Sequence, residues 1–162
     1  MLGRFHSVEL LATLATLAAG PATAQLLEVP ITELTDSMRA HPKAALVLIS
    51  TDWCAYCRIQ QVQLKKRNEW LDTSPSIYFS VLDAETKETI VFNDMSYRFV
   101  PNGVSTGSHE LAFSLGNIDN RLVFPTWVLL NENLEIIFKF PGVIKASELS
   151  KLLETVEKSW PP

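Results

Sequence analysis

An uninterrupted apolar segment that leads into a Cys-x-x-Cys motif constrains this chain more than any other feature. Residues 44–49 read Ala-Ala-Leu-Val-Leu-Ile, which is the length and composition of a strand buried on both faces of a sheet. Cys54 and Cys57 follow closely, and residues 58–70 predict a helix. Because these are the only two cysteines among 162 residues, disulfides cannot hold the fold together, and a hydrophobic core must do so.

The remaining pattern predicts an α/β fold with a mixed central β-sheet flanked by helices. Residues 127–130 and 136–140 are apolar strands whose short connection makes them antiparallel neighbours. Thr32 is placed to cap a first helix that ends at Pro42, and Ser147 to cap a last one. The other expected elements are a strand over 76–82, a β-hairpin over 89–100 that turns at Asn93-Asp94, a loop over 101–108 and a helix over 109–115.

The same pattern predicts which side chains are buried. Tyr56, Ile59 and Val62 are expected on the inner face of the helix that follows the cysteine motif, opposite the wet basic run 65–67. His109 is interpreted as a partly exposed residue at a helix start, in preference to a proton shuttle. The expected core also includes Trp70, Trp127 and the phenylalanines within 138–140.

The first 24 residues predict a secretory signal peptide. Arg4 precedes a short apolar run over 10–19, Gly20-Pro21 interrupts it, and residues 22–24 supply the small side chains that a signal peptidase reads. The apolar run is too short to cross a bilayer, which argues against an N-terminal membrane anchor. We therefore expect residues 25–162 to form one domain that is periplasmic or secreted and does not span a membrane.

Charge restricts the partners of that domain. The chain has 14 Lys and Arg residues against 18 Asp and Glu residues, a formal net charge of −4. Nucleic-acid binding relies on clustered basic residues, so we expect no nucleic-acid partner.

The position of the cysteines points to redox chemistry. At the start of a helix, Cys54 meets unpaired backbone N–H groups and the positive end of the helix dipole, which favour a thiolate. Cys57, one turn later, is placed to attack a mixed disulfide formed at Cys54. Three other readings remain open: a zinc half-site, for which only His41 and His109 could complete the ligands, a purely structural disulfide, and two unrelated buried thiols.

Two motifs together resemble the thioredoxin superfamily, in particular bacterial exported thioredoxin-like proteins. They are Trp53-Cys54-Ala55-Tyr56-Cys57 after an apolar strand and Phe124-Pro125-Thr126 at the start of a later one, with Gly142 beyond. The resemblance implies a thioredoxin-like fold in which Pro125 is cis and lies against the disulfide. It also implies that Phe124 pairs through its backbone with an extended substrate. The residues that it suggests for substrate contact are Trp53, Tyr56, Phe124, Pro125 and Thr126, with a packing role as the alternative for Trp53.

The chain departs from the thioredoxin pattern at two places. Leu48 and Phe79 occupy the positions of a buried aspartate and a lysine that manage protons for the second thiol, so Cys57 must use water or another group, such as Glu85 or Asp52. The connection that precedes Pro125 is long, with an insertion over about residues 86–121, and connections of such length are usually structured or functional.

Two functions follow from this reading. The first is an exported thiol–disulfide oxidoreductase, a monomer without cofactor or metal, in which Cys54 attacks and Cys57 resolves. It would reduce or exchange disulfides of protein partners and depend on a redox donor or acceptor protein. The second is a binding or scaffold module on the same fold, whose insertion captures a partner while the cysteines stay oxidised.

Overall fold

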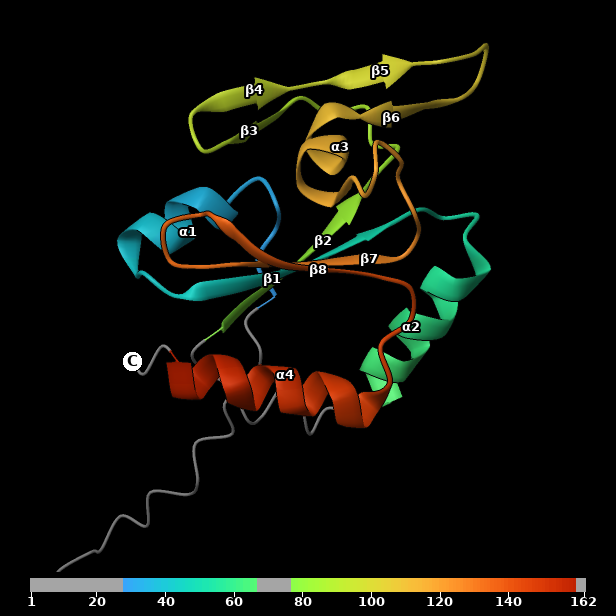
Figure 1. Ribbon diagram of the computed structural model, residues 1–162. Coiled ribbons are helices and arrows are strands. Elements are labelled where there is room, and N and C mark those ends of the chain that lie inside the picture. Colours follow the sequence, from blue (N-terminus) through green and yellow to red (C-terminus); the bar gives the residue numbers. More distant parts are fainter. Residues whose placement is uncertain (1–27, 67–76, 160–162) are drawn as a thin grey trace, which may run out of the picture.

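The computed structural model of the protein describes residues 28–66 and 77–159 (Figure 1). The predicted signal peptide, the predicted core residue Trp70 and Ser76 at the start of the predicted second strand lie outside these residues. In chain order the elements are α1 (Leu34–Ala40), β1 (Ala44–Ser50), α2 (Ala55–Lys66), β2 (Ile77–Asp83), β3 (Ile90–Phe92), β4 (Met95–Tyr97), β5 (Phe99–Pro101), β6 (Gly107–His109), α3 (Glu110–Gly116), β7 (Thr126–Leu130), β8 (Ile136–Pro141) and α4 (Ala146–Ser159).

A four-stranded mixed sheet forms the centre of the molecule. Its strand order is β2-β1-β7-β8, with β1 parallel to β2 and the other two pairings antiparallel. All residues of β1 and β7 are buried, because both strands are central and helices cover both of their faces. The prediction of a mixed sheet with a central apolar strand is confirmed.

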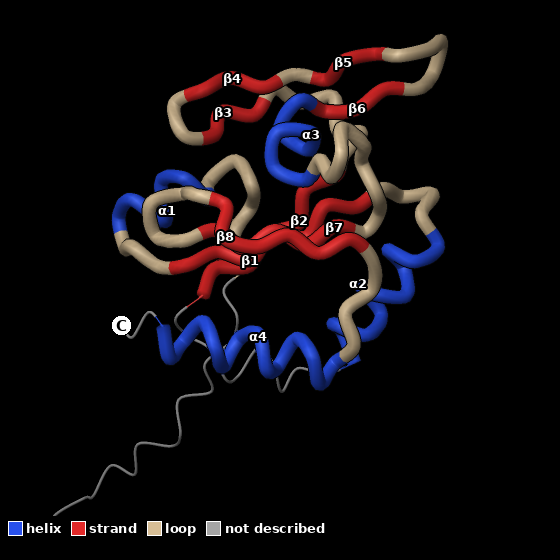
Figure 2. The backbone as a smooth tube through the Cα atoms, viewed as in Figure 1, coloured by secondary structure: helices blue, strands red, loops and turns tan. Residues whose placement is uncertain are grey.

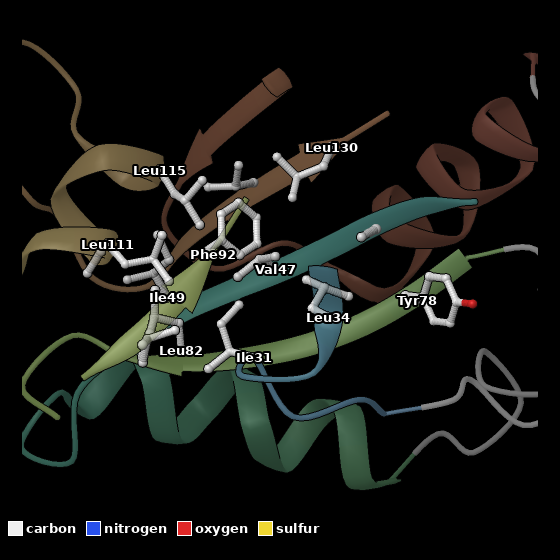
Figure 3. Close-up of a cluster of buried hydrophobic side chains, with 14 of the residues drawn as sticks. Ile31, Leu34, Val47, Ile49, Tyr78, Leu82, Phe92, Leu111, Leu115 and Leu130 are labelled. Atoms are coloured by element: carbon white, nitrogen blue, oxygen red, sulfur yellow. The ribbon is translucent and has the colours of Figure 1, made fainter. Parts of the chain in front are cut away.

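Helices cover the sheet on both faces, α1 and α3 on one and α2 and α4 on the other (Figures 1 and 2). Side chains alternate along β1, so Val47 and Ile49 point to the first face and Leu46 and Leu48 to the second. Figure 3 shows the first cluster, in which Val47 and Ile49 pack with side chains from α1, β3 and α3. The sheet therefore separates two apolar layers.

Residues 84–125, which connect β2 to β7, hold two hairpins and α3 (Figure 1). The first hairpin, β3–β4, confirms the predicted turn at Asn93 and Asp94, whose φ angles of 49° and 63° suit a tight two-residue hairpin. Arg39 of α1 anchors this turn through both carboxylate oxygens of Asp94, at 2.9 and 2.6 Å. Thr35 Oγ1 also accepts the Asn93 N–H.

The second hairpin, β5–β6, corrects the sequence prediction. Phe99 and Val100 belong to this hairpin, pairing with His109 and Ser108, and not to the end of the first. Residues 101–108 are therefore not wholly a loop. At the tip, the Asn102 N–H donates to the Thr106 carbonyl, and the Thr106 hydroxyl donates to Asn102 Oδ1. Its strands are only three residues long, too short to show a clear alternation of apolar and polar residues.

His109 is fully buried, which corrects the expectation of a partly exposed residue. It is the N-cap of α3, where its Nδ1 accepts the Leu111 N–H. Its Nε2 lies 3.0 Å from the Glu88 carbonyl. With Nδ1 as acceptor, Nε2 carries the proton and donates to that carbonyl. The histidine therefore joins α3 to the loop after β2.

Two predicted helix caps are wrong. The N-cap of α1 is Glu33 without a side-chain cap, so Thr32 does not serve there. Ser147 lies inside the first turn of α4, which begins at Ala146. A Glu148 carboxylate oxygen faces the Lys145 N–H instead, at 3.3 Å. Sequence placed both helices but not their first residues, because several neighbouring residues can satisfy the same N–H groups.

The inner face of α2 also differs from the prediction. Tyr56, Ile59 and Val62 are 66%, 48% and 48% exposed, whereas Cys57 and Gln60 are fully buried. Burial of Cys57 sets the rotation of the helix, because residues one turn further along share its face. Gln60 Oε1 accepts the Ile144 N–H at 2.8 Å and so ties α2 to the segment before α4.

Among the expected aromatic core residues, Trp127 is fully buried, as predicted. Phe138 is 38% exposed, because β8 is an edge strand with partial cover only.

None of the helices that the structure describes is long and apolar enough to cross a membrane.

Candidate active site

Three segments that are distant in the sequence meet at one end of the sheet. The antiparallel register pairs Ile49, near the end of β1, with Thr126, the first residue of β7. The parallel register pairs Ser50 with Asp83 at the end of β2. The cysteine motif after β1, the loop after β2 and the Phe124-Pro125 segment before β7 must therefore lie together.

Cys54 and Cys57 form a disulfide at the N-terminus of α2, with a Cα–Cα distance of 5.2 Å. Cys54 directly precedes Ala55, the first residue of the helix, and is 5% exposed. Its Sγ accepts the Cys57 N–H at 3.1 Å, as an N-cap side chain does. Cys57 has no exposed surface. The sulfur nearer the surface is thus the one that the helix N-terminus supports.

This arrangement can stabilise negative charge on Cys54 after reduction. The first N–H groups of a helix lack partners within the helix, and the helix dipole adds positive potential there. A thiolate at Cys54 would keep the N–H of Cys57 as donor, and hydrogen bonds to ionised acceptors are roughly twice as strong as neutral ones. The geometry therefore suits Cys54 as nucleophile and the buried Cys57 as resolving thiol.

Trp53 and Phe124 join the two motifs across the site. Their ring centroids are 5.9 Å apart and the rings are nearly perpendicular, the edge-to-face geometry that aromatic pairs favour. Trp53 nevertheless stays 64% exposed. Its indole Nε1 donates to Glu85 Oε2 at 3.0 Å, so the loop after β2 fixes the indole from the other side.

The Phe124–Pro125 peptide bond is cis, the conformation that the thioredoxin resemblance implies. Pro125 is buried, and its carbonyl accepts the Gly142 N–H at 2.7 Å. Thr126 is fully buried and its hydroxyl donates to the Val123 carbonyl at 2.6 Å. The side chain of Thr126 thus supports the turn before β7, and its contact with a substrate stays a prediction.

Apolar residues occupy the positions where the thioredoxin pattern has ionisable ones. Leu48 is fully buried and Phe79 is 7% exposed. Of the two proton acceptors considered for Cys57, Glu85 is engaged by Trp53 and Asp52 is exposed.

The described residues contain no group of three or more His, Cys, Asp or Glu side chains placed to hold a metal ion.

Two exposed aromatic side chains belong to the cysteine motif. Trp53 and Tyr56 flank Cys54 in the sequence and are both about two-thirds exposed, at 64% and 66%. The sequence reading missed two further parts of this surface: Ile59, one turn beyond Tyr56, and the second hairpin near Trp53. Outward rotation of Ile59 follows from burial of Cys57, and the Asn102-Gly103 pair was the available signal for the hairpin turn.

No protein-family model and no curated protein matches the sequence. Several solved structures, however, are similar to the structure of this chain. A mutant thioredoxin from Halobacterium salinarum matches with a TM-score of 0.53 and 18% identity, over 85% of this chain and 96% of that one. Chloroplastic thioredoxin z matches with a TM-score of 0.51 and 13% identity, over 83% and 96%. A Schistosoma mansoni thioredoxin pre-protein matches with a TM-score of 0.50 and 17% identity, over 82% and 98%.

Proposed function

The chain has a thioredoxin-like α/β fold, and we propose that it is an exported thiol–disulfide oxidoreductase acting on protein cysteines. One observation carries the proposal. The sulfur of Cys54 caps α2 and accepts the Cys57 N–H beside the Trp53–Phe124 contact and the cis Pro125. A purely structural bond would have little use here, since a disulfide across so short a loop removes little freedom from the unfolded chain.

The reaction proceeds by two exchanges. In the reduced protein the Cys54 thiolate attacks one sulfur of a client disulfide, and the other client sulfur leaves as a thiolate. The Cys57 thiolate then attacks Cys54 Sγ, which re-forms the Cys54–Cys57 bond and releases the second client sulfur. Two electrons pass from the cysteine pair to the client, and a redox donor protein must return them.

The surrounding residues are proposed to position the client, and they do not supply a buried carboxylate for proton transfer. In this proposal Phe124 offers its backbone to an extended client segment, as in β-augmentation. Trp53 and Tyr56 supply exposed aromatic surface on both sides of Cys54. Because Leu48 and Phe79 are apolar, neither can accept the Cys57 proton, which must pass to water or another group.

Insulin reduction by dithiothreitol tests the activity. We expect the wild-type protein to accelerate precipitation of the insulin B chain and Cys54→Ser to lack the acceleration. In Cys57→Ser the mixed disulfide cannot be resolved within the protein, so the reduced variant mixed with insulin after removal of dithiothreitol is expected to retain a covalent adduct that added dithiothreitol releases. Equal rates for wild type and Cys54→Ser would contradict the proposal.

The redox direction is measured separately. We propose a reductant or exchange enzyme, for which equilibration of the cysteine pair with glutathione should give a potential near that of thioredoxin, about −270 mV. A value near −120 mV would identify an oxidant of the DsbA type.

Export is the second part of the proposal. It rests on the order of basic, apolar and small residues within positions 1–24. Expression of the full chain in a bacterium followed by N-terminal sequencing of the periplasmic fraction should give Gln25 as the first residue. Recovery of the uncleaved chain in the cytoplasm would contradict it.

A scaffold function is the competing proposal, and the exposed apolar side chains of Trp53, Tyr56 and Ile59 favour it. A scaffold would bind its partner equally well with Cys54→Ser and Cys57→Ser combined. An oxidoreductase would lose the covalent adduct in that double variant.

A further inference from the structure

A groove of about 420 Å³ lies beside the candidate active site. We call it the Trp53 groove and define it by its lining residues, which are Trp53, Glu85, Asn102, Thr106, Gly107, Ser108, Phe113, Leu122 and Phe124. Two of these adjoin the proposed chemistry, because Trp53 directly precedes Cys54 and Phe124 directly precedes Pro125. The groove therefore lies next to the cysteine motif and the cis-proline segment.

The two sides of the groove differ in chemistry. Trp53 of the cysteine motif, together with Phe113, Leu122 and Phe124 of the β2–β7 connection, supplies apolar surface. Phe113 is 41% exposed although it lies on a helix that covers the sheet. The second hairpin supplies the polar side through Asn102, Thr106 and Ser108. Apolar surface with a few convergent polar groups is typical of a binding site.

The polar side is held firmly in place. Gly107 has room for hydrogen only, because a Cβ at this position would collide with the Phe99 ring and the Val100 carbonyl. The His109 N–H donates to the Ala84 carbonyl at 2.7 Å, which fastens β6 to the end of β2. The Arg98 N–H donates to Glu110 Oε2 and the Glu110 N–H donates to the Arg98 carbonyl, both at 2.8 Å. Close packing and backbone hydrogen bonds therefore hold the second hairpin in position beside the groove.

The groove also has a charge preference. Glu85 is the only ionisable residue among the described residues that line it. One of its carboxylate oxygens accepts the Trp53 Nε1 proton, which leaves its charge at the rim of the groove next to the indole. An acidic client side chain would be repelled there, whereas a basic one would be attracted.

From these observations we infer that the Trp53 groove binds the client segment that flanks the reacting cysteine, and that it selects apolar and basic flanking residues over small polar and acidic ones. The occupant is an extended cysteine-containing peptide segment. This inference rests on the proposed oxidoreductase function and assigns to the second hairpin a role in client selection. Because its lining residues Trp53 and Phe124 directly precede Cys54 and Pro125, a client segment bonded to Cys54 has this surface beside it.

Peptides with one cysteine in a mixed disulfide with glutathione test the inference. Four peptides carry Leu, Ser, Lys or Asp at both positions flanking the cysteine. The reduced protein attacks each mixed disulfide, and the rate is divided by the rate of the same peptide with dithiothreitol to remove intrinsic reactivity. We expect preferences of about three- to tenfold for Leu over Ser and for Lys over Asp, the range that one apolar contact or one surface charge supplies.

Two variants locate the preferences in the groove. Phe113→Ala should reduce the Leu over Ser ratio to below about twofold, because it removes an apolar lining side chain. Val100→Ala is the matched control: Val100 is 47% exposed in the same connection but does not line the groove, and it should keep the wild-type ratio. Glu85→Gln should abolish the Lys over Asp ratio while it keeps an acceptor for Trp53. Circular dichroism at the assay temperature shows whether each variant is folded. If Phe113→Ala does not fold, the Lys over Asp ratio of Glu85→Gln still tests the inference.

The outcomes separate the two proposals. A wild-type protein that reacts with none of the peptides, nor with oxidised glutathione, contradicts the oxidoreductase function itself. Equal normalised rates for all four peptides contradict groove selection alone. Ratios that persist unchanged in both Phe113→Ala and Glu85→Gln also contradict it, since the preference would then arise elsewhere.

Discussion

Single residues in this protein gain their roles from what surrounds them. Cys54 and Cys57 are chemically identical, yet one caps α2 at the surface and the other has no exposed surface. His109 has the side chain of a potential proton shuttle, but both of its ring nitrogens are engaged with the backbone. Proton transfer is therefore not a role that its position supports, and its contribution is to stability.

We predict that His109→Ala lowers the free energy of unfolding by about 2–4 kcal/mol, because it removes a helix cap and leaves a cavity in the buried layer. Urea denaturation measures the change. His41→Ala is the control, since His41 is exposed, and its effect should stay within about 0.5 kcal/mol. Equal effects of the two substitutions would show that the buried contacts of His109 do not matter.

At the scale of elements, polar contacts determine how helices and hairpins sit on the sheet. Gln60 is fully buried on α2, and its contact with Ile144 reaches the segment that leads into α4. Arg39 reaches from α1 to the turn of the first hairpin, far along the chain. Sequence patterns show neither contact, because residues on different elements meet only after the sheet has formed.

Gln60→Leu should lower the free energy of unfolding by about 1–3 kcal/mol, because the buried Ile144 N–H loses its acceptor. Gln61→Leu is the control: it makes the same change one residue along the helix at a partly exposed site. Chemical denaturation of both variants provides the comparison. The contact would carry no net stability if Gln60→Leu proved as stable as its control.

The Arg39–Asp94 pair gives a pH-dependent prediction. Hydrogen bonding to Arg39, followed by its charge, lowers the pKa of Asp94 below the ordinary value of 3.8. The unfolded chain therefore binds a proton at Asp94 at higher pH than the folded chain does. The pair stabilises the fold at pH values above the ordinary pKa, and this stabilisation is lost as pH falls through the lowered pKa. At pH 7 in low salt, wild type should have a higher melting temperature than Asp94→Asn. This difference in melting temperature should disappear as pH falls through the lowered pKa.

Calorimetry of wild type and Asp94→Asn across that range measures the effect, which salt should reduce because both groups are largely exposed. Asn tolerates the positive φ of position 94, so the turn itself should survive. Asp119→Asn is the control, because Asp119 also has a positive φ (50°) in an exposed turn. A difference independent of pH would assign the stability to the turn and not to the pair.

At the scale of the whole molecule, β1 is shared by both apolar layers. Val47 and Ile49 pack on the side of α1 and α3, and Leu46 and Leu48 on the side of α2 and α4. Loss of packing in either layer should therefore weaken one cooperative unit. The end of this strand also leads to Cys54, so the same element that joins the layers positions the disulfide.

We predict that Leu48→Ala and Val47→Ala each destabilise the whole fold, by about 2–5 kcal/mol for the leucine and less for the smaller valine. Far-ultraviolet circular dichroism and tryptophan fluorescence should report a single coincident transition in each variant. Separate transitions in one variant would show that the two layers unfold independently.

The sequence could predict the elements whose signal is local. The apolar runs of β1 and β7, the turn at Asn93 and Asp94, and the antiparallel β7–β8 pair all agree with the structure. The second hairpin, the rotation of α2 and the burial of His109 did not follow from it. In each of these cases the deciding contacts come from distant segments, such as Ala84 for β6 and Glu88 for His109.

By itself, the sequence determined the fold class and the identity of the cysteine pair, because apolar periodicity and residue spacing act over a few neighbouring positions. The tertiary structure alone decided what lies around that pair. The register of β1 against β2 and β7 places Trp53 between Glu85 and Phe124 and brings the second hairpin to the same groove. Register depends on pairing across the whole sheet, so the surface that would select a client became visible only in the folded molecule.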